Sequence, residues 1–361
     1  MSTPSKQMYF ERLLANGGHP RSLDLPAARA WVKRLLKEMA VQDWFAIAYL
    51  SVLITAVLIA PASSGRTMNL ERLSALSVAF VAILLVTRGG LIRKGVVSAL
   101  LYRAGLLGVT LISYFMLRGL LPVVNTGGLD AELYALDLQV FGFEPALWFD
   151  QFVTVRTTEW FAFFYYSYFF LISAFVLPLL FLGRRMRLFA DFAISFMGVY
   201  CVAHVIYMLV PGYGPYQFLA DEFHNTLPMG FWYERVLEAV NGAGAQKDIF
   251  PSLHTAGPTT CFLFAFRHRK LTPYKYVWIP TGFFAANIII ATMFLRWHYI
   301  IDIIAGIALA SLLSYVAVHL STWEQGFRKQ RGLQPVWRSL WQGNKPAAEV
   351  APERHAAPAA E

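Results

Sequence analysis

The sequence from Trp160 to Leu182 reads WFAFFYYSYFFLISAFVLPLLFL, 23 residues without a charged side chain. A helix of about 20 apolar residues crosses the hydrocarbon core of a bilayer, so this stretch predicts a transmembrane helix. Comparable apolar runs recur on both sides of it. Together the candidate spans are Trp44–Ala62, Leu73–Thr87, Val96–Leu121, Trp160–Leu182, Phe192–Val210, Ser252–Phe266, Tyr276–Leu295 and Tyr299–Thr322. The sequence therefore predicts an all-α polytopic membrane protein with about eight transmembrane helices.

The composition of the whole chain agrees with this class. Of 361 residues, 57% are hydrophobic and 15% charged, and the mean hydropathy is +0.48, which excludes a soluble globular domain and a disordered chain. The 31 Lys and Arg residues exceed the 22 Asp and Glu residues, as expected of cytoplasmic loops that face anionic headgroups, so no nucleic-acid partner is predicted. Both cysteines, Cys201 and Cys261, lie inside apolar runs, so neither a disulfide framework nor a zinc site is indicated.

The orientation follows from the segments between the spans. Basic segments such as Arg184–Arg187 and Arg267–Lys275 alternate with acidic ones such as Asp130–Asp150 and Asp221–Asp248. Because basic loops stay inside, both termini are predicted to be cytoplasmic, in an integral protein of the cell membrane. The first span would act as an uncleaved anchor, since no signal peptide precedes it.

The chain divides into four parts. Residues 1–42 form a cytoplasmic arm with a basic amphipathic helix from Pro26, and residues 43–121 hold the first three spans. Residues 122–322 form the catalytic membrane core, with extracytoplasmic loops at 122–159 and 211–251. Residues 323–361 form a cytoplasmic tail that is largely disordered, because its Ala, Pro and Glu cannot bury a core.

One candidate site begins where a loop turns into the sixth predicted span, at Phe250-Pro251-Ser252-Leu253-His254. Proline followed by serine favours a helix start with Ser252 as the N-cap. The free backbone N–H groups of this turn, around Ser252 and Leu253, and the helix dipole favour an anion such as phosphate. His254 would then stand beside the bound phosphate.

A second candidate cluster is Arg296-Trp297-His298-Tyr299-Ile300-Ile301-Asp302, at the outer start of the last span. Four-residue spacing places His298 and Asp302 on one helix face, within hydrogen-bonding reach. The carboxylate would fix the imidazole tautomer, which makes His298 the candidate nucleophile and Asp302 its orienting partner. His254, at the same membrane face, would protonate the leaving oxygen, and Arg296 offers bidentate donors to phosphate.

Other interpretations of these residues stay open. Each histidine alone could be an interfacial polar residue, and His254, His298 and Asp302 also form a two-histidine, one-carboxylate set that could bind a metal ion. His204, inside the fifth span, is expected to be a packed core residue. The chain could also be a non-catalytic transporter or scaffold, although transport favours charged residues near the midplane and here they cluster at one face.

The two clusters resemble the second and third signature motifs of the type 2 phosphatidic acid phosphatase superfamily. Their residue patterns are most similar to those of the inositol phosphorylceramide synthase branch: Pro-Ser-Leu-His in the first cluster and His298-Tyr299-x-x-Asp302-x-x-x-Gly306 in the second. The resemblance covers roughly residues 125–320. It implies a six-helix membrane core, a phosphohistidine on His298, a carboxylate partner in Asp302 and a general acid in His254, with neither cofactor nor metal.

The chain departs from the phosphatases of that superfamily at their phosphate-binding positions. Thr292 stands where their third motif has an arginine, and their first motif, Lys-x6-Arg-Pro, has no clear counterpart. The phosphate is therefore expected to be held by other groups, with Arg296, Lys247 and Arg235 as candidates.

The resemblance implies an enzyme that cleaves a lipid phosphoester at the extracytoplasmic face. In the nearer branch it transfers a phospho-headgroup, such as phosphoinositol, from a membrane phospholipid donor to a lipid or glycan hydroxyl. The alternative is a lipid or polyprenyl phosphate phosphatase in which water is the acceptor. One fold supports both reactions.

Overall fold

The computed structural model describes residues 25–92, 94–181 and 185–340, and the regular structure in these ranges is helical. Its α-helices are α2 (Leu25–Glu38), α3 (Val41–Ile59), α4 (Ser64–Thr87), α5 (Val96–Val124), α6 (Asp130–Phe141), α7 (Pro145–Phe149), α8 (Val155–Phe181), α9 (Met186–Leu209), α10 (Pro215–Phe218), α11 (Phe231–Ala243), α12 (Leu253–Arg267), α13 (Tyr274–Phe294) and α14 (Ile300–Gln330). Short 3-10 helices cover Asp150–Phe152 and Ala220–Glu222. The tail that was predicted to be largely disordered from residue 323 begins as the end of α14, which continues to Gln330, and Trp337 is buried. The rest of this prediction falls on residues 341–361, outside the described residues.

Seven of the described helices are long and apolar enough to cross a membrane, namely α3, α4, α5, α8, α9, α13 and α14. The protein is therefore an integral multi-pass membrane protein, as its composition predicted. The remaining predicted span, the sixth along the chain, corresponds to α12, which has 15 residues. At 1.5 Å per residue α12 is about 22 Å long, shorter than the hydrocarbon core.

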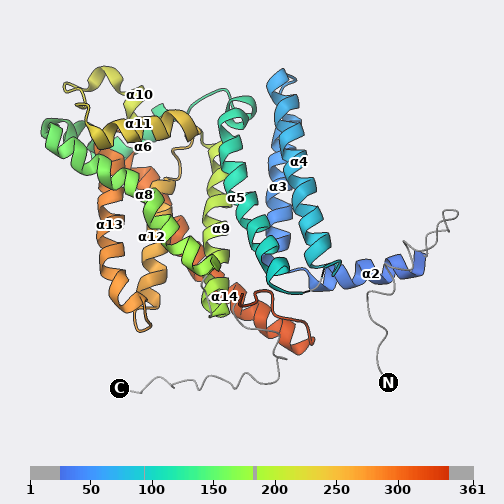
Figure 1. Cartoon of the computed structure of the whole chain (residues 1–361). Coiled ribbons are helices and arrows are strands. Elements are labelled where there is room, and N and C mark those ends of the chain that lie inside the picture. Colours follow the sequence, from blue (N-terminus) through green and yellow to red (C-terminus); the bar gives the residue numbers. More distant parts are fainter. Residues whose placement is uncertain (1–24, 93, 182–184, 341–361) are drawn as a thin grey trace.

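The long helices form two groups that meet at α9. Helices α3, α4 and α5 stand together on one side and α8, α12 and α13 on the other, with α9 and α14 between them (Figure 1). In the most apolar stretch of α9, 61% is buried inside the molecule, against 22% to 39% in the other six spans. Helix α9 is thus the central element of the core.

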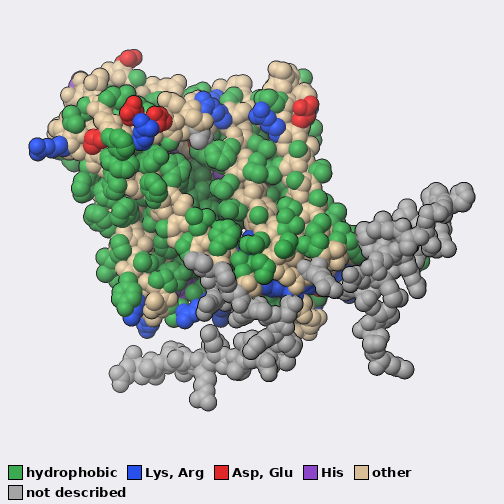
Figure 2. All heavy atoms as spheres, viewed as in Figure 1, with side chains coloured by type: hydrophobic (Ala, Val, Ile, Leu, Met, Phe, Trp, Pro, Cys, Tyr) green, Lys and Arg blue, Asp and Glu red, His purple; other side chains and the backbone are tan. Residues whose placement is uncertain are grey.

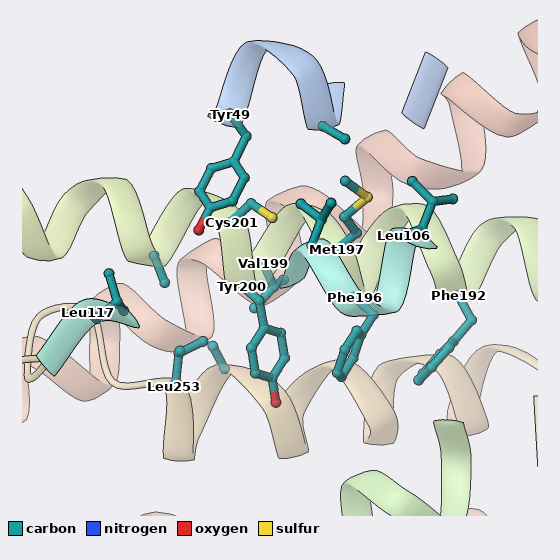
Figure 3. Close-up of a cluster of buried hydrophobic side chains, with 14 of the residues drawn as sticks. Tyr49, Leu106, Leu117, Phe192, Phe196, Met197, Val199, Tyr200, Cys201 and Leu253 are labelled. Carbon is teal, nitrogen blue, oxygen red and sulfur yellow. The ribbon is translucent and has the colours of Figure 1, made fainter. Parts of the chain in front are cut away.

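The packing around α9 joins the two groups. Its side chains Phe192, Phe196 and Tyr200 point toward α12, and Tyr49 of α3 reaches the opposite side of α9 (Figure 3). Tyr49 also provides a hydrogen-bond partner for His204 of α9. The His204 side chain is fully buried, and its Nδ1 lies 2.8 Å from the Tyr49 hydroxyl. The expectation that His204 is a packed core histidine is confirmed.

The two long predicted loops are largely helical. They contain α6, α7, α10 and α11, and these short helices gather at the end of the molecule where α14 begins (Figure 1). The Asp130 carboxylate joins the two segments, because it accepts hydrogen bonds from the backbone N–H groups of Tyr213 and Gly214 at 2.8 to 3.0 Å. Gly214 has a φ of +91°, and a Cβ there would lie 2.4 Å from the carbonyl oxygen of Trp297. The segment thus packs directly on the backbone beside His298.

Helix α2 lies across the opposite end of the molecule, beside the ends of α3 and α4 (Figure 1). Its Trp31 indole donates a hydrogen bond to the carbonyl of Gly89 at 3.1 Å. Lys33, Arg34 and Lys37 are exposed. The predicted helix is present, and its binding to the membrane surface stays a prediction.

Candidate active site

His298 and Asp302 contact each other through the start of α14. The Nδ1 atom of His298 lies 3.2 Å from Oδ2 of Asp302, and the same oxygen accepts the backbone N–H of Tyr299 at 3.0 Å. The sequence predicted both residues on one helix face. That detail is wrong, because α14 begins at Ile300 and His298 precedes it. The contact arises instead because Asp302 folds back over the helix start as part of a capping box.

The start of α12 is fixed against α14. Ser252 caps α12 as predicted, its hydroxyl accepting the backbone N–H of Thr255 at 3.2 Å. Its own N–H donates to the carbonyl of Asp302 at 3.0 Å. At Gly306 of α14, a Cβ would lie 2.7 Å from the Ser252 carbonyl oxygen and 3.1 Å from the Thr255 side chain. Glycine at this position therefore lets the two helix starts approach.

His254 is held between two aromatic rings of α8. The Tyr165 ring stacks on its imidazole at 4.3 Å between centroids with 15° between the planes, and the Tyr168 ring lies at the same distance on a tilt of 38°. The centroids of the His254 and His298 rings are 6.4 Å apart. The structure thus brings His254, His298 and Asp302 together from two predicted motifs. A phosphoryl group would fit between two imidazoles at this spacing.

The start of α14 is also anchored by α6. Both carboxylate oxygens of Asp137 accept backbone N–H groups of α14, from Ile300 at 2.7 Å and Ile301 at 3.0 Å. Glu144 lies close to this carboxylate, and burial raises the pKa of Glu144 to about 8, with a further contribution from Asp137. Acidic side chains therefore satisfy the amides of the first turn that no intrahelical acceptor reaches.

The cations predicted to bind phosphate have other partners in the structure. The Lys247 ammonium is buried and donates to the carbonyls of Asn125, Thr126 and Gly127 at 2.9 to 3.2 Å. The Arg296 guanidinium pairs with Asp150 at 2.7 Å. It also bonds the Asn225 carbonyl and lies over the Phe223 ring. Arg235 pairs with Glu238 on α11 at 2.7 Å. To bind phosphate, each of these cations would have to break its present hydrogen bonds or ion pair and form new ones with the phosphate oxygens.

A cavity of about 380 Å³ opens beside the two histidines. The walls that α5, α8 and α9 contribute are mostly apolar, although they include several tyrosines, and the end near α10 and α11 is lined by Tyr213, Tyr216, Trp297, Gln246 and Asp248. Leu111 and Phe115 of α5 and Phe169 and Leu177 of α8, which line it, are 41% to 61% exposed, so it opens sideways. Figure 2 shows this hollow between α8 and α5, with a histidine side chain at its base. The cavity therefore has a polar end and a lipid-facing apolar end.

The electrostatics of the cavity are unusual for a phosphate site. Among the described residues, none of those that line it is Lys or Arg, and Asp248 supplies a carboxylate. Burial lowers the pKa of His298 to about 4, with Asp248 opposing that effect. At neutral pH the imidazole is thus uncharged and its lone pair is available for attack. Burial raises the pKa of Asp248 itself.

A model of the PAP2 superfamily matches residues 131–316, just over half of the chain, and the chain belongs to this superfamily. Membership supports phosphoesterase or phosphotransferase activity on lipids. Neither the curated proteins nor the solved structures gave a significant match.

The matched region contains α8, α9, α12, α13 and the first half of α14, and it begins after the end of α5. Helix α5 packs against α9 and lines the cavity, so it contributes to the site although it lies outside the matched region. The described residues hold no group of three or more His, Cys, Asp and Glu side chains placed to bind a metal ion.

Four residues at the site were not singled out from the sequence: Tyr114, Tyr165, Tyr168 and Asp248. Aromatic residues are so frequent in the spans that Tyr165 and Tyr168 could not be separated from lipid-facing rings. Asp248 carries a weak signal, since three apolar residues, Ile249, Phe250 and Pro251, separate it from Ser252. Tyr114 carries no signal, because its partner Asp248 is 134 residues away.

Proposed function

We propose that the protein is a phosphotransferase that cleaves a lipid phosphoester through a phosphohistidine on His298 and passes the phospho-headgroup to a hydroxyl. The observation that carries this proposal is the pair of imidazoles, His298 oriented by Asp302 and His254 6.4 Å away, at the polar end of a cavity open to lipid. The residue roles match those that the superfamily resemblance implies.

The reaction would proceed in two steps. Nε2 of neutral His298 attacks phosphorus and forms an N–P bond, while the bond from phosphorus to the diacylglycerol oxygen breaks. His254 gives a proton to that oxygen, since the negative charge of the bound phosphate opposes the effect of burial and favours a protonated imidazole there, and Asp302 stabilises the positive charge on His298. An acceptor hydroxyl then attacks phosphorus and the N–P bond breaks. The acceptor proton passes to His254, which restores the starting state.

The phosphate oxygens would lie at the start of α12. The amides of Leu253 and His254 have no carbonyl one turn earlier in the helix, and the dipole of α12 favours an anion there. Ser252 holds this turn in place through its cap. Arg296 and Lys247 remain candidates for the outer part of the phosphate site, on condition that substrate displaces their present partners.

Two features support a phosphodiester donor and an alcohol acceptor, as in the inositol phosphorylceramide synthase branch. The cavity holds the Asp248 carboxylate, and none of its described lining residues is Lys or Arg. A carboxylate repels a doubly charged phosphomonoester more strongly than a singly charged diester. The apolar walls also admit a lipid alcohol. A lipid phosphate phosphatase, in which water attacks the phosphohistidine, is the second candidate, since the superfamily supports both reactions.

The membrane placement belongs to the proposal as well. The site would face the extracytoplasmic side, with both termini in the cytoplasm, because basic and acidic loops alternate along the sequence. In the structure the acidic α6 stands at the end where α14 begins, and α2 with its lysines stands at the other (Figure 1).

The test is mass spectrometry of lipid products from purified protein given phosphatidylinositol with and without ceramide, beside the His298→Asn variant. A new phospho-headgroup lipid that requires both ceramide and His298 would establish the transferase. Diacylglycerol with free inositol phosphate, again dependent on His298, would establish water as the acceptor. Equal turnover by the wild type and His298→Asn would refute the phosphohistidine.

A further inference from the structure

Asp248 places a carboxylate in the catalytic cavity that the phosphohistidine mechanism does not use. It lies between α11 and α12, and its backbone pairs with Gly212 in an isolated bridge. The Tyr114 hydroxyl of α5 donates to its Oδ2 at 3.3 Å. The carboxylate is thus held in one orientation from two distant segments.

This carboxylate forms no ion pair with Lys or Arg among the described residues, and the nearby His298 is a cation only when its imidazole is protonated. The ion pairs found in those residues do not include Asp248, and Lys247 beside it turns to backbone carbonyls instead. A partly buried carboxylate that lacks a cation is stabilised by hydrogen-bond donors, and its oxygens accept only. Hydroxyl groups of a bound substrate would supply such donors.

The surroundings of Asp248 fit a ring that carries hydroxyl groups. Tyr213, Tyr216 and Trp297 line the same end of the cavity, and the Tyr216 and Trp297 rings are 4.7 Å apart between centroids. Gln246 adds an amide with both donor and acceptor capacity. Aromatic faces pack on the C–H faces of a cyclic polyol while carboxylate and amide groups bond its hydroxyls.

The lipid's orientation in the cavity follows from the same lining. The acyl chains belong at the apolar end between α5 and α8, so the leaving diacylglycerol lies on that side. The headgroup stays on phosphorus during transfer and must occupy the polar end, where Asp248 lies.

We propose that Asp248, positioned by Tyr114, accepts hydrogen bonds from hydroxyls of the headgroup that remains on phosphorus, and so selects donors with a polyol headgroup. This assignment rests on the proposed function, because it requires a phosphodiester donor in the catalytic cavity. It makes α5, which lies outside the region matched by the superfamily model, part of substrate selection.

The experiment compares two diester donors, phosphatidylinositol and phosphatidylethanol, whose headgroup has no free hydroxyl. Asp248→Asn should lower the ratio of their kcat/KM values by about tenfold or more, because bonds from hydroxyls to a charged acceptor are among the stronger ones. Tyr114→Phe should lower the ratio less, through KM rather than kcat. Asp221→Asn, at an exposed carboxylate of the same loop, is the matched control.

A binding measurement separates this proposal from the mechanism. In the His298→Asn background, which blocks turnover, phosphatidylinositol should raise the melting temperature more than phosphatidylethanol does, and adding Asp248→Asn should abolish that difference. A preference that survives in the double variant overturns the role of Asp248, as does the absence of any preference in His298→Asn alone. Turnover that persists in His298→Asn overturns the phosphohistidine but leaves the binding comparison decisive for Asp248.

Discussion

A single oxygen of Asp302 performs two tasks. Oδ2 contacts the His298 imidazole and also accepts the N–H of Tyr299, so the group that orients the nucleophile also caps α14. A carboxylate that bonds Nδ1 holds the imidazole in the tautomer that frees Nε2. Asparagine keeps an acceptor for the cap but can present its NH₂ group to His298 and favour the wrong tautomer.

We expect Asp302→Asn to lower kcat by about 10³- to 10⁴-fold with little loss of thermal stability. Headgroup release from a labelled donor lipid measures the first quantity, and unfolding in detergent measures the second. Asp191→Asn is the control. Asp191 is a buried carboxylate of α9 that accepts a hydrogen bond from Ser321 and does not contact the site residues. A fall in kcat no larger than in this control would refute the orienting role.

Glu144 predicts a pH-dependent stability. Burial, reinforced by Asp137, raises the pKa of Glu144 from 4.5 to about 8, so the folded protein retains a proton that the unfolded chain loses. The free energy of unfolding should therefore fall as pH rises from about 4.5 to about 8. Glu144→Gln, which cannot ionise, should flatten this part of the profile.

Melting temperatures of the wild type and Glu144→Gln at several pH values between 5 and 9 would test this expectation. The exposed Glu222→Gln provides the comparison. Parallel profiles for all three proteins would show that Glu144 is not the group responsible.

The approach of α12 to α14 depends on one side chain being absent. Gly306→Ala adds a Cβ 2.7 Å from the Ser252 carbonyl oxygen, so the start of α12 must shift away from α14. A displacement of about 1 Å between reacting groups can cost 10²-fold in rate, and we expect a loss of kcat of that order. Overpacking should also destabilise the fold by about 1 to 3 kcal/mol.

The matched control for this substitution lies in the same helix. Gly326→Ala adds a Cβ with nothing within 4 Å, so it should leave activity unchanged and slightly stabilise α14 through helix propensity. The kcat and the melting temperature of both variants, compared with those of the wild type, test this expectation. Equal effects at Gly306 and Gly326 would mean that helix packing at the site is not limiting.

The local elements of the site could be predicted, but their tertiary supports could not. The Ser252 cap and the proximity of His298 to Asp302 span at most four residues, so the sequence pattern contains them. Asp137 accepts a hydrogen bond from the backbone amide of Ile300, which is 163 residues away, and no local sequence pattern predicts a contact between residues so far apart.

The partners of the candidate phosphate-binding cations could not be predicted from the sequence. Lys247 and Arg296 have the side chains that phosphate sites use, and they lie close in sequence to the motifs. In the fold they bond carbonyls and Asp150, which the sequence does not reveal.

At the scale of the whole molecule, the alternation of basic and acidic segments predicts which end faces the cytoplasm. We expect a membrane-impermeant maleimide to label Asp221→Cys in intact cells and Arg331→Cys only after permeabilisation. Both positions are exposed, and the native Cys201 and Cys261 are buried, so background labelling should be low. The reverse pattern of labelling would invert the proposed topology.

The shortness of α12 bears on how the enzyme would meet its substrate. With a length of about 22 Å, α12 begins several ångströms inside a hydrocarbon core of about 30 Å if its other end reaches the opposite surface. The reacting imidazole of His254 is then recessed, and the lipid reaches it by diffusing in the plane of the bilayer. The kinetics should consequently show surface dilution. The rate depends on the mole fraction of donor lipid in the membrane, and it does not change when the total lipid concentration is varied at constant mole fraction.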